Sequence, residues 1–151
     1  MRRPGSSANG LRIQADAALL LGLALMLTPP LVKAQDMPYT VQCQDGARSG
    51  TECQVDKKTY IGWRTYHAFC HVCHAQDAVG STFAPSLLDR LNDIDKAQYL
   101  NSIAEGYTGQ VGVMPAWKDN PNVNKRYEEL YAYLKARADG VLPPGRPKRL
   151  K

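Results

Sequence analysis

Apolar side chains recur with helical spacing near the end of the chain. The four residues that follow the i, i+3, i+4, i+7 pattern are Tyr127, Leu130, Tyr131 and Leu134. This spacing places them on one face of a helix, which we expect over residues 124–138. An asparagine at Asn122 or Asn124 can cap its start, and Gly140 followed by Pro143 ends it.

A second helix is predicted over residues 56–70. Gly62, Tyr66 and Cys70 are four residues apart, so they share one face of this helix. A glycine inside a helix is unfavourable by about 1 kcal/mol relative to alanine. We therefore expect Gly62 to mark a close helix crossing, with Leu130 or Tyr131 of the last helix lying over it.

A third helix is predicted to start at Asp93 or Asp95 and to end near Gly106. Its expected buried residues are Ala97, Leu100, Ile103 and Ala104. A loop with three glycines follows over residues 106–113. The chain shows neither an internal repeat nor the alternation of apolar and polar residues that predicts strands, so the sequence indicates an all-α fold for one domain.

The first 34 residues have the features of an export signal. Arginines at the start precede an apolar run of about a dozen residues over 17–27, which suits a signal peptide and is short for a membrane span. Cleavage is expected between Ala34 and Gln35, which makes the protein periplasmic and leaves it without a membrane anchor. An uncleaved N-terminal anchor stays open as the alternative.

The basic character of the chain resides mainly in its ends. Removing residues 1–34 takes away four basic residues and one acidic residue, which lowers the formal net charge from +5 to +2. Four of the remaining bases lie in residues 141–151, so the part that is expected to fold is slightly acidic. This balance excludes a nucleic-acid-binding protein. Residues 141–151 are predicted to be a disordered basic tail, either as a solvated end or as a docking segment for an acidic partner.

The four cysteines form two pairs with different roles. Cys70, Cys73 and His74 form the C-x-x-C-H sequence, which is typical of the covalent attachment of haem c. The two thiols alone also fit a redox disulfide or half of a zinc site. Cys43 and Cys53 lie in a polar extension over residues 35–56, and an oxidising compartment favours a disulfide between them.

An electron-carrying haem iron needs a second axial ligand opposite His74. His67 and His71 lie too close to the attachment segment to reach the far face of the ring. The chain after the leader has only two methionines, Met37 near its start and Met114. Met114 follows the glycine-rich loop, and Pro115 biases it away from helix, so Met114 is the predicted ligand; a methionine that only fills the core is the alternative.

Several motifs resemble those of class I cytochromes c. They are the Gly62, Tyr66 and Cys70–His74 spacing, the Ala84-Pro85-Ser86-Leu87 segment, Met114-Pro115 and the tyrosine-rich last helix. The resemblance covers residues 57–139 and implies a small all-α fold whose N- and C-terminal helices cross at Gly62. It also implies that the Pro85 carbonyl accepts a hydrogen bond from His74 and that Leu87 packs on the haem. Ala84 departs from the glycine that is usual in the family.

A narrower resemblance concerns the partners. The cysteine-bearing extension, the Tyr107–Gly112 loop and the ending over residues 138–147 are similar to those of periplasmic cytochromes c that accept electrons from PQQ-dependent alcohol dehydrogenases, including those of methanol and ethanol oxidation. The sequence thus predicts a cytochrome c domain over residues 57–140 with one covalent haem c. Its expected function is a monomeric, non-enzymatic electron carrier towards a terminal oxidase.

The sequence leaves three alternatives to this function open. The first is a five-coordinate haem protein with peroxidase-like or gas-binding activity. The second is a haem subunit that is fixed permanently to a dehydrogenase. The third is a thiol–disulfide or zinc module that uses Cys70 and Cys73 without haem.

Overall fold

The computed structural model describes residues 37–110 and 112–151. The predicted export signal and its cleavage point lie outside the described residues. Among the residues that are described, no helix has the length and apolar character needed to cross a membrane.

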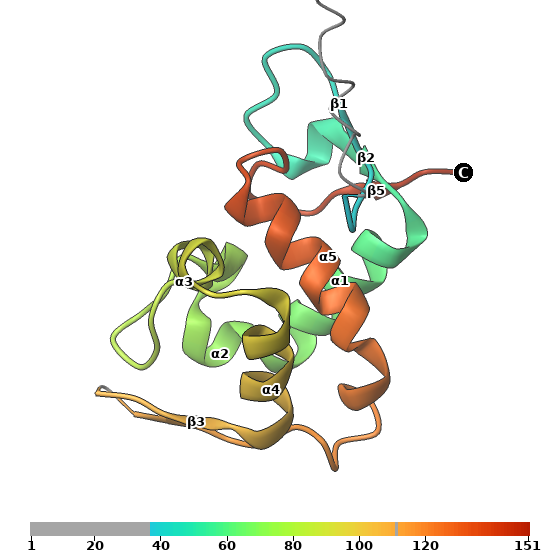
Figure 1. The fold of residues 1–151 in the computed structure, drawn as a ribbon. Helices are drawn as coiled ribbons and strands as arrows, with labels where there is room; N and C mark the ends of the chain where they lie inside the picture. Colours follow the sequence, from blue (N-terminus) through green and yellow to red (C-terminus); the bar gives the residue numbers. More distant parts are fainter. Residues whose placement is uncertain (1–36, 111) are drawn as a thin grey trace, which may run out of the picture. The chain divides into compact units, whose positions relative to one another are not determined.

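Two long helices, α1 (Lys57–Phe69) and α5 (Tyr127–Ala138), cross at the centre of the fold (Figure 1). Asp56 caps α1, because its side chain accepts a hydrogen bond from the Thr59 backbone N–H at 2.9 Å. A short 3-10 helix, η3 (Asn124–Arg126), leads into α5. The helices predicted over residues 56–70 and 124–138 are confirmed to within three residues at each end.

The crossing is closest at Gly62. A Cβ atom placed on Gly62 would lie 1.9 Å from the Glu129 carbonyl oxygen and 2.9 Å from Cβ of Tyr133. The prediction of a close crossing is therefore confirmed, but the expected partners Leu130 and Tyr131 are wrong. The backbone of α5 at Glu129 and the side chain of Tyr133 lie over the glycine, because α5 is rotated so that Tyr133 is fully buried between the helices.

The middle of the chain forms four short elements: α2 (His71–His74), the 3-10 helix η2 (Gln76–Ala78), α3 (Leu87–Asp93) and α4 (Lys96–Glu105). The side chain of Asp95 caps α4 by accepting from Gln98 N at 2.7 Å, which confirms the later of the two predicted starts. The expected burial of Ala97 is wrong: Ala97 is exposed, and the buried residues of α4 are Tyr99 and Ile103. The larger aromatic residue takes the inward position because it removes more apolar surface from water.

Five short strands accompany the helices, although the sequence pattern predicts none. β3 (Tyr107–Thr108) and β4 (Val113–Met114) form an antiparallel hairpin after α4. β1 (Val41–Cys43) and β2 (Cys53–Val55) form a second antiparallel pair. Each strand has only two or three residues, which is too short for an alternating pattern to be recognised in the sequence.

The N-terminal extension and the C-terminal tail form one small sheet. A 3-10 helix, η1 (Gly50–Glu52), connects β1 to β2, and the structure contains the predicted Cys43–Cys53 disulfide within this pair. The tail adds β5 (Lys148–Arg149), which runs parallel to β2 with Val55 opposite Arg149. The Gly50 N–H also donates to the Pro144 carbonyl oxygen at 2.6 Å.

The prediction that residues 141–151 are disordered is wrong. Leu142 and Pro147 are fully buried, and the Leu150 N–H donates to the Val55 carbonyl oxygen at 2.8 Å. Proline and basic residues normally lower the apolar area that a segment can bury. Here the open edge of β2 supplies hydrogen-bond partners that lie about a hundred positions away in sequence, so local composition does not reveal them.

Replacing Gly62 with alanine is expected to lower the free energy of unfolding of the haem-loaded protein by about 3 kcal/mol or more, because the added methyl group meets backbone that cannot move independently. Denaturant unfolding measures this loss. Gly46→Ala is the matched control: Gly46 has open space around it and a φ of +73°, so alanine costs only about 1 kcal/mol there. Equal losses for the two variants would contradict the close crossing.

Candidate haem site

The attachment segment is folded into one tight turn at the end of α1. Cys70 follows the last residue of α1 and its N–H donates to the Tyr66 carbonyl oxygen at 2.8 Å. The N–H groups of Cys73 and His74 both donate to the Cys70 carbonyl oxygen, at 3.2 and 3.1 Å. Both cysteines are free thiols. The structure thus brings the two predicted attachment thiols and the predicted ligand histidine together on α2.

The ring of His74 is buried and oriented by the backbone of Pro85. The Nδ1–H of His74 donates to the Pro85 carbonyl oxygen at 3.0 Å, which is the contact that the sequence resemblance implies. This bond leaves Nε2 as the nitrogen that can bind a metal. Burial lowers the pKa of His74, although the bond to Pro85 opposes the shift. The neutral imidazole that a metal requires is therefore favoured.

The turn that leads to Pro85 contains the residue that departs from the family pattern. Ala84 is buried, and its carbonyl oxygen accepts a hydrogen bond from Ser81 N at 2.8 Å. Its φ is not positive, so the turn does not require glycine at this position. Leu87 begins α3, is partly buried and packs against the core.

The loop after His74 contains three non-glycine residues in the left-handed region of backbone space. They are Ala75, Asp77 and Ala78, with φ values of 60°, 61° and 69°. Such residues each cost of the order of 1–3 kcal/mol and persist only where surrounding contacts hold them. Here the Tyr66 hydroxyl donates to the Ala75 carbonyl oxygen at 2.5 Å.

Arg137 and the tail hold Asp77 in this loop. Arg137 lies at the end of α5 and is buried, and its guanidinium donates to the carbonyl oxygens of Asp77 (3.3 and 3.4 Å) and Leu142 (2.5 Å). The Asp77 carboxylate accepts from the Gly145 N–H at 2.9 Å. We name this set of contacts from Arg137 and Gly145 to Asp77 the Asp77 latch. The sequence analysis missed the latch; the only signal was that Arg137 shares one helix face with Leu130, Tyr133 and Leu134.

Met114 lies on β4 and is anchored on both sides. On one side, Met114 pairs with Tyr107 of β3 in the antiparallel hairpin. On the other side, Trp117 packs edge-on against Phe69 with ring centroids 6.1 Å apart, next to Cys70. Met114 itself is partly buried and packs against the core. These contacts keep the β3–β4 hairpin beside the attachment turn and hold Trp117 in packing rather than at an exposed edge.

The environment of Cys70 does not favour thiol–disulfide chemistry. Burial, with a further contribution from the neighbouring Cys73, raises the pKa of the Cys70 thiol to about 12. A thiol must ionise to attack a disulfide, so Cys70 in this folded environment is a poor nucleophile at neutral pH. Among the described residues, no group of three or more histidine, cysteine, aspartate or glutamate side chains could hold a metal ion. The zinc alternative gains no support from this part of the chain.

The residues around the attachment turn fit a flat, largely apolar group with a few polar atoms. Val72, Phe83 and Val113 are each more than 70 % exposed despite their apolar side chains. Tyr99 is buried and its hydroxyl has no hydrogen-bond partner among the described residues. Burial, together with the nearby Cys70 thiol, raises the pKa of Tyr99 and keeps it a neutral donor. The set of two thiols, one imidazole and one thioether matches the chemistry of haem c.

The two other histidines form part of a row of aromatic rings that runs from α1 to the first residue of α2. His67 Nδ1 donates to the Trp63 carbonyl oxygen at 2.8 Å, and its ring lies 4.8 Å from that of Trp63. His67 also stacks with His71, with centroids 6.2 Å apart.

A family model described as cytochrome c oxidase, cbb3-type, subunit III, matches residues 58–134, just over half of the chain. The chain belongs to this family of c-type cytochromes. As a member of it, the cytochrome carries covalently bound haem c. The fold described above, mostly helical with crossing terminal helices, is that of a class I cytochrome c.

Individual relatives agree with this assignment. The cytochrome is 34% identical over 92 residues to cytochrome c-555 of Methylococcus capsulatus, covering 60% of this chain and 72% of the relative. It is 39% identical over 120 residues to cytochrome c-553I of Paracoccus denitrificans, covering 77% of this chain and half of the relative. The crystal structure of the c-type cytochrome XoxG from Methylobacterium extorquens AM1 superposes with a TM-score of 0.61 at 43% identity, covering 65% of this chain and 62% of that one.

Replacing Arg137 with methionine is expected to lower the free energy of unfolding by about 3 kcal/mol, because two buried carbonyl oxygens lose a charged donor. Denaturant unfolding of the haem-loaded cytochrome measures the effect. Lys135→Met is the control from the same helix, since Lys135 forms a partly exposed ion pair with Asp139 and is not part of the latch, so its loss is expected to cost about 1 kcal/mol. A loss for Arg137→Met no larger than that of the control would show that the latch does not hold the loop.

Proposed function

We propose that this cytochrome is a periplasmic carrier that accepts single electrons from a PQQ-dependent alcohol dehydrogenase and passes them towards a terminal oxidase. The observation that carries the electron-transfer part is the hydrogen bond from His74 Nδ1 to Pro85 O, 3.0 Å long. It fixes the ring beside two free thiols with Nε2 left for the metal. An electron can pass through this arrangement without any substrate being bound or released.

We assign the contacts to the haem as follows. Cys70 and Cys73 would hold the haem through two thioethers, His74 Nε2 and the Met114 sulfur would bind its iron, and Leu87 would pack on the ring. The bound haem supplies a metal that changes reversibly by one electron. Methionine sulfur favours the ferrous state and raises the reduction potential. The Pro85 bond raises the basicity of His74 and keeps its ring from rotating.

Rigidity of the ligand positions supports a carrier rather than a catalyst. His74 is held by Pro85 and by the Asp77 latch on the following loop, and Met114 is held by its pairing with Tyr107 and by the packing of Trp117. Ligands that stay in place between oxidation states keep the reorganisation of the site small. An open axial position, in contrast, would favour chemistry with dioxygen or peroxide.

The proposed donor rests on sequence features that lie outside the haem-binding helices. These are the cysteine-bearing extension, the loop between β3 and β4, and the tail. In the structure the extension and the tail are joined in the β1–β2–β5 sheet, so two of the three features form one surface element. This element is separate from the haem ligands, as expected for a part that recognises a partner. We also propose that the carrier is a monomer that diffuses between donor and acceptor.

Met114→Ala is expected to abolish the weak sulfur-to-iron absorption band of the oxidised protein near the red edge of the spectrum and to lower the reduction potential. Met37→Ala is the matched control, because Met37 is the other methionine of the described chain and lies exposed near its start. Optical spectroscopy and potentiometry measure both effects. A band that persists in Met114→Ala would refute Met114 as the ligand, and rapid carbon monoxide binding by the reduced wild-type protein would favour the five-coordinate alternative.

Stopped-flow mixing with a purified quinoprotein alcohol dehydrogenase and its alcohol is expected to reduce the cytochrome in a bimolecular reaction. The observed rate should rise with cytochrome concentration and fall with added salt, as for other electrostatically steered encounters. The same enzyme without alcohol is the control. Gel filtration of the mixture distinguishes a diffusing carrier, which elutes alone, from a fixed subunit, which co-elutes. A donor that fails to reduce the cytochrome would refute the proposed partner.

A further inference from the structure

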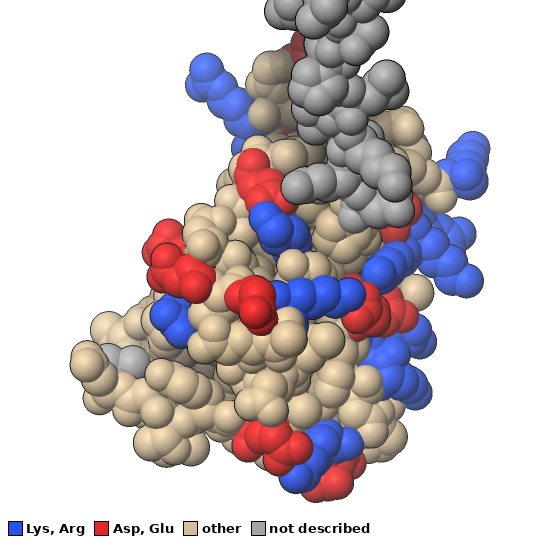
Figure 2. All heavy atoms as spheres, viewed as in Figure 1, with Lys and Arg blue, Asp and Glu red and all other residues tan. Residues whose placement is uncertain are grey.

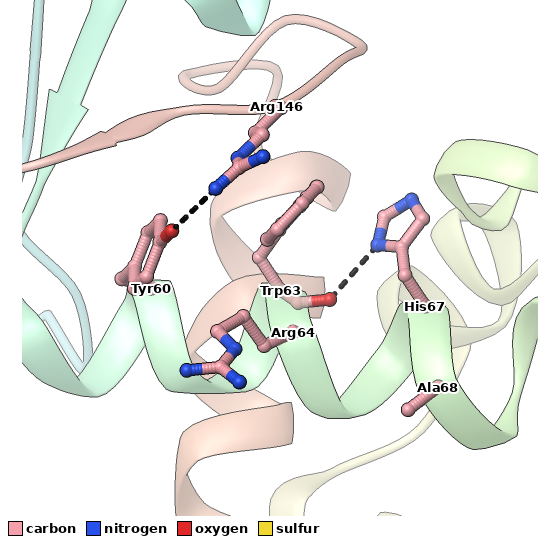
Figure 3. Close-up of a pocket in the computed structure, with 6 residues that line it drawn as sticks. All are labelled: Tyr60, Trp63, Arg64, His67, Ala68 and Arg146. Carbon is pink, nitrogen blue, oxygen red and sulfur yellow. Dashed lines mark hydrogen bonds between the residues drawn. The ribbon is translucent and has the colours of Figure 1, made fainter.

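A shallow depression of about 370 Å³ lies between α1 and the C-terminal tail (Figure 3). Its lining residues are Tyr60, Trp63, Arg64, His67, Ala68 and Arg146. We name this site the α1–tail depression. In Figure 3 the Arg146 side chain comes from the tail and lies over Tyr60 and Trp63, whereas Arg64 extends from α1 itself.

The guanidinium of Arg146 is held in position by two aromatic side chains. It lies over the Trp63 ring at 5.4 Å from the ring centre, and its Nη2 donates to the Tyr60 hydroxyl at 3.2 Å. The Tyr60 and Trp63 rings are stacked on each other with centroids 5.9 Å apart. An arginine that is held in this way loses less conformational freedom when it binds an anion, so its remaining N–H groups form an organised anion-binding fork.

Neither arginine of the depression is neutralised by the described residues. Six lysines and arginines of the described chain form ion pairs with carboxylates, but Arg64 and Arg146 belong to none of these pairs. No acidic residue lines the depression. Figure 2 shows lysine and arginine side chains gathered along the right-hand edge of the view, where the tail ends in Figure 1. Residues 37–151 contain 15 basic and 12 acidic residues, and two of these bases line the depression with no acidic residue beside them in its lining.

The depression is linked to the haem attachment turn by stacked rings. Trp63 lies 4.8 Å from His67, and His67 lies 6.2 Å from His71, which is part of the attachment segment. A protein that binds at the depression is therefore placed close to the attachment turn. Closeness matters for a carrier, because the rate of electron tunnelling falls steeply with distance.

We propose that the α1–tail depression binds a carboxylate side chain of the electron donor and so docks the donor beside the attachment turn. Guanidinium groups pair with carboxylates through two parallel hydrogen bonds, and the aromatic floor excludes water from part of that pair. The depression is open and shallow, which suits a side chain that protrudes from a protein surface. This inference rests on the proposed function for the identity of the donor, but not for the chemistry of the site.

Binding is tested first without any donor. The probe is acetyl-tetraglutamate amide, added to the reduced, haem-loaded, ¹⁵N-labelled cytochrome and followed by NMR, with the tetraglutamine peptide as the neutral control. The expected result is a shift of the side-chain N–H signals of Arg64, Arg146 and Trp63 with the glutamate peptide alone. Shifts confined to other regions would overturn the site. Inorganic phosphate that binds there more tightly than the peptide would identify a free-anion site and overturn the docking proposal.

Matched variants separate this site from general charge effects. Arg146→Gln and, independently of the tail, Arg64→Gln are each expected to weaken peptide binding about fivefold. Arg149→Gln removes the same charge from the same tail outside the depression and is expected to weaken binding less than twofold. Reduction potentials and unfolding midpoints are measured for all three variants to show that the haem and the fold are intact. Equal effects of Arg146→Gln and Arg149→Gln would overturn the proposal.

The same variants are then mixed with the dehydrogenase in the stopped-flow experiment. Arg146→Gln and Arg64→Gln should lower the bimolecular rate constant about fivefold at low salt, with little difference from wild type at high salt, where exposed charges are screened. If the dehydrogenase does not reduce the wild-type protein, the proposed donor is wrong, while the peptide experiment still decides the carboxylate site. If reduction is normal in all variants, the depression does not dock this donor.

Discussion

The close crossing of α1 and α5 at Gly62 is the constraint on which the rest of the structure depends. The backbone of Glu129 and the side chain of Tyr133 lie directly against Gly62, so the two helices cross closely. The C-terminal ends of both helices therefore reach the loop that follows His74. The end of α1 presents Cys70 and, one turn later, His74. The end of α5 presents Arg137, which binds the carbonyl oxygen of Asp77. A bulkier residue at position 62 would separate the helix ends that carry Cys70 and Arg137.

The backbone strain of the loop after His74 is offset by contacts from other parts of the chain. Three residues with positive φ within four positions are unfavourable locally, and their conformation is kept by the Tyr66 hydroxyl, by Arg137 and by Gly145 of the tail. The tail in turn is paired with β2, which the Cys43–Cys53 disulfide joins to β1. Segments at both ends of the chain, far from the C-x-x-C-H motif in sequence, thereby support the loop that follows His74. The N-terminal extension is connected to this loop through the tail.

In this cytochrome the positions of the charged side chains matter more than the net charge. The leader accounts for part of the formal charge of +5, and residues 37–151, which include the ordered tail, carry a formal charge of +3. Packing of the tail on α1 brings Arg146 next to Arg64 and Trp63 and creates a local positive site. The same packing that holds Asp77 therefore also forms the α1–tail depression, so haem support and the proposed partner recognition use one structural element.

The sequence by itself determined the features that depend on spacing along a helix or on the chemistry of single residues. The C-x-x-C-H motif, the two long helices, the glycine at their crossing and the Cys43–Cys53 disulfide could all be predicted, because each is encoded within a short segment or by a rare residue type. Only the tertiary structure decided which residues of α5 lie over Gly62, that Tyr99 rather than Ala97 is buried, and that the tail is ordered. These features depend on rotation of a helix about its axis and on hydrogen bonds between residues up to about a hundred positions apart. Such contacts depend on how the whole chain packs, so a local sequence pattern does not predict them.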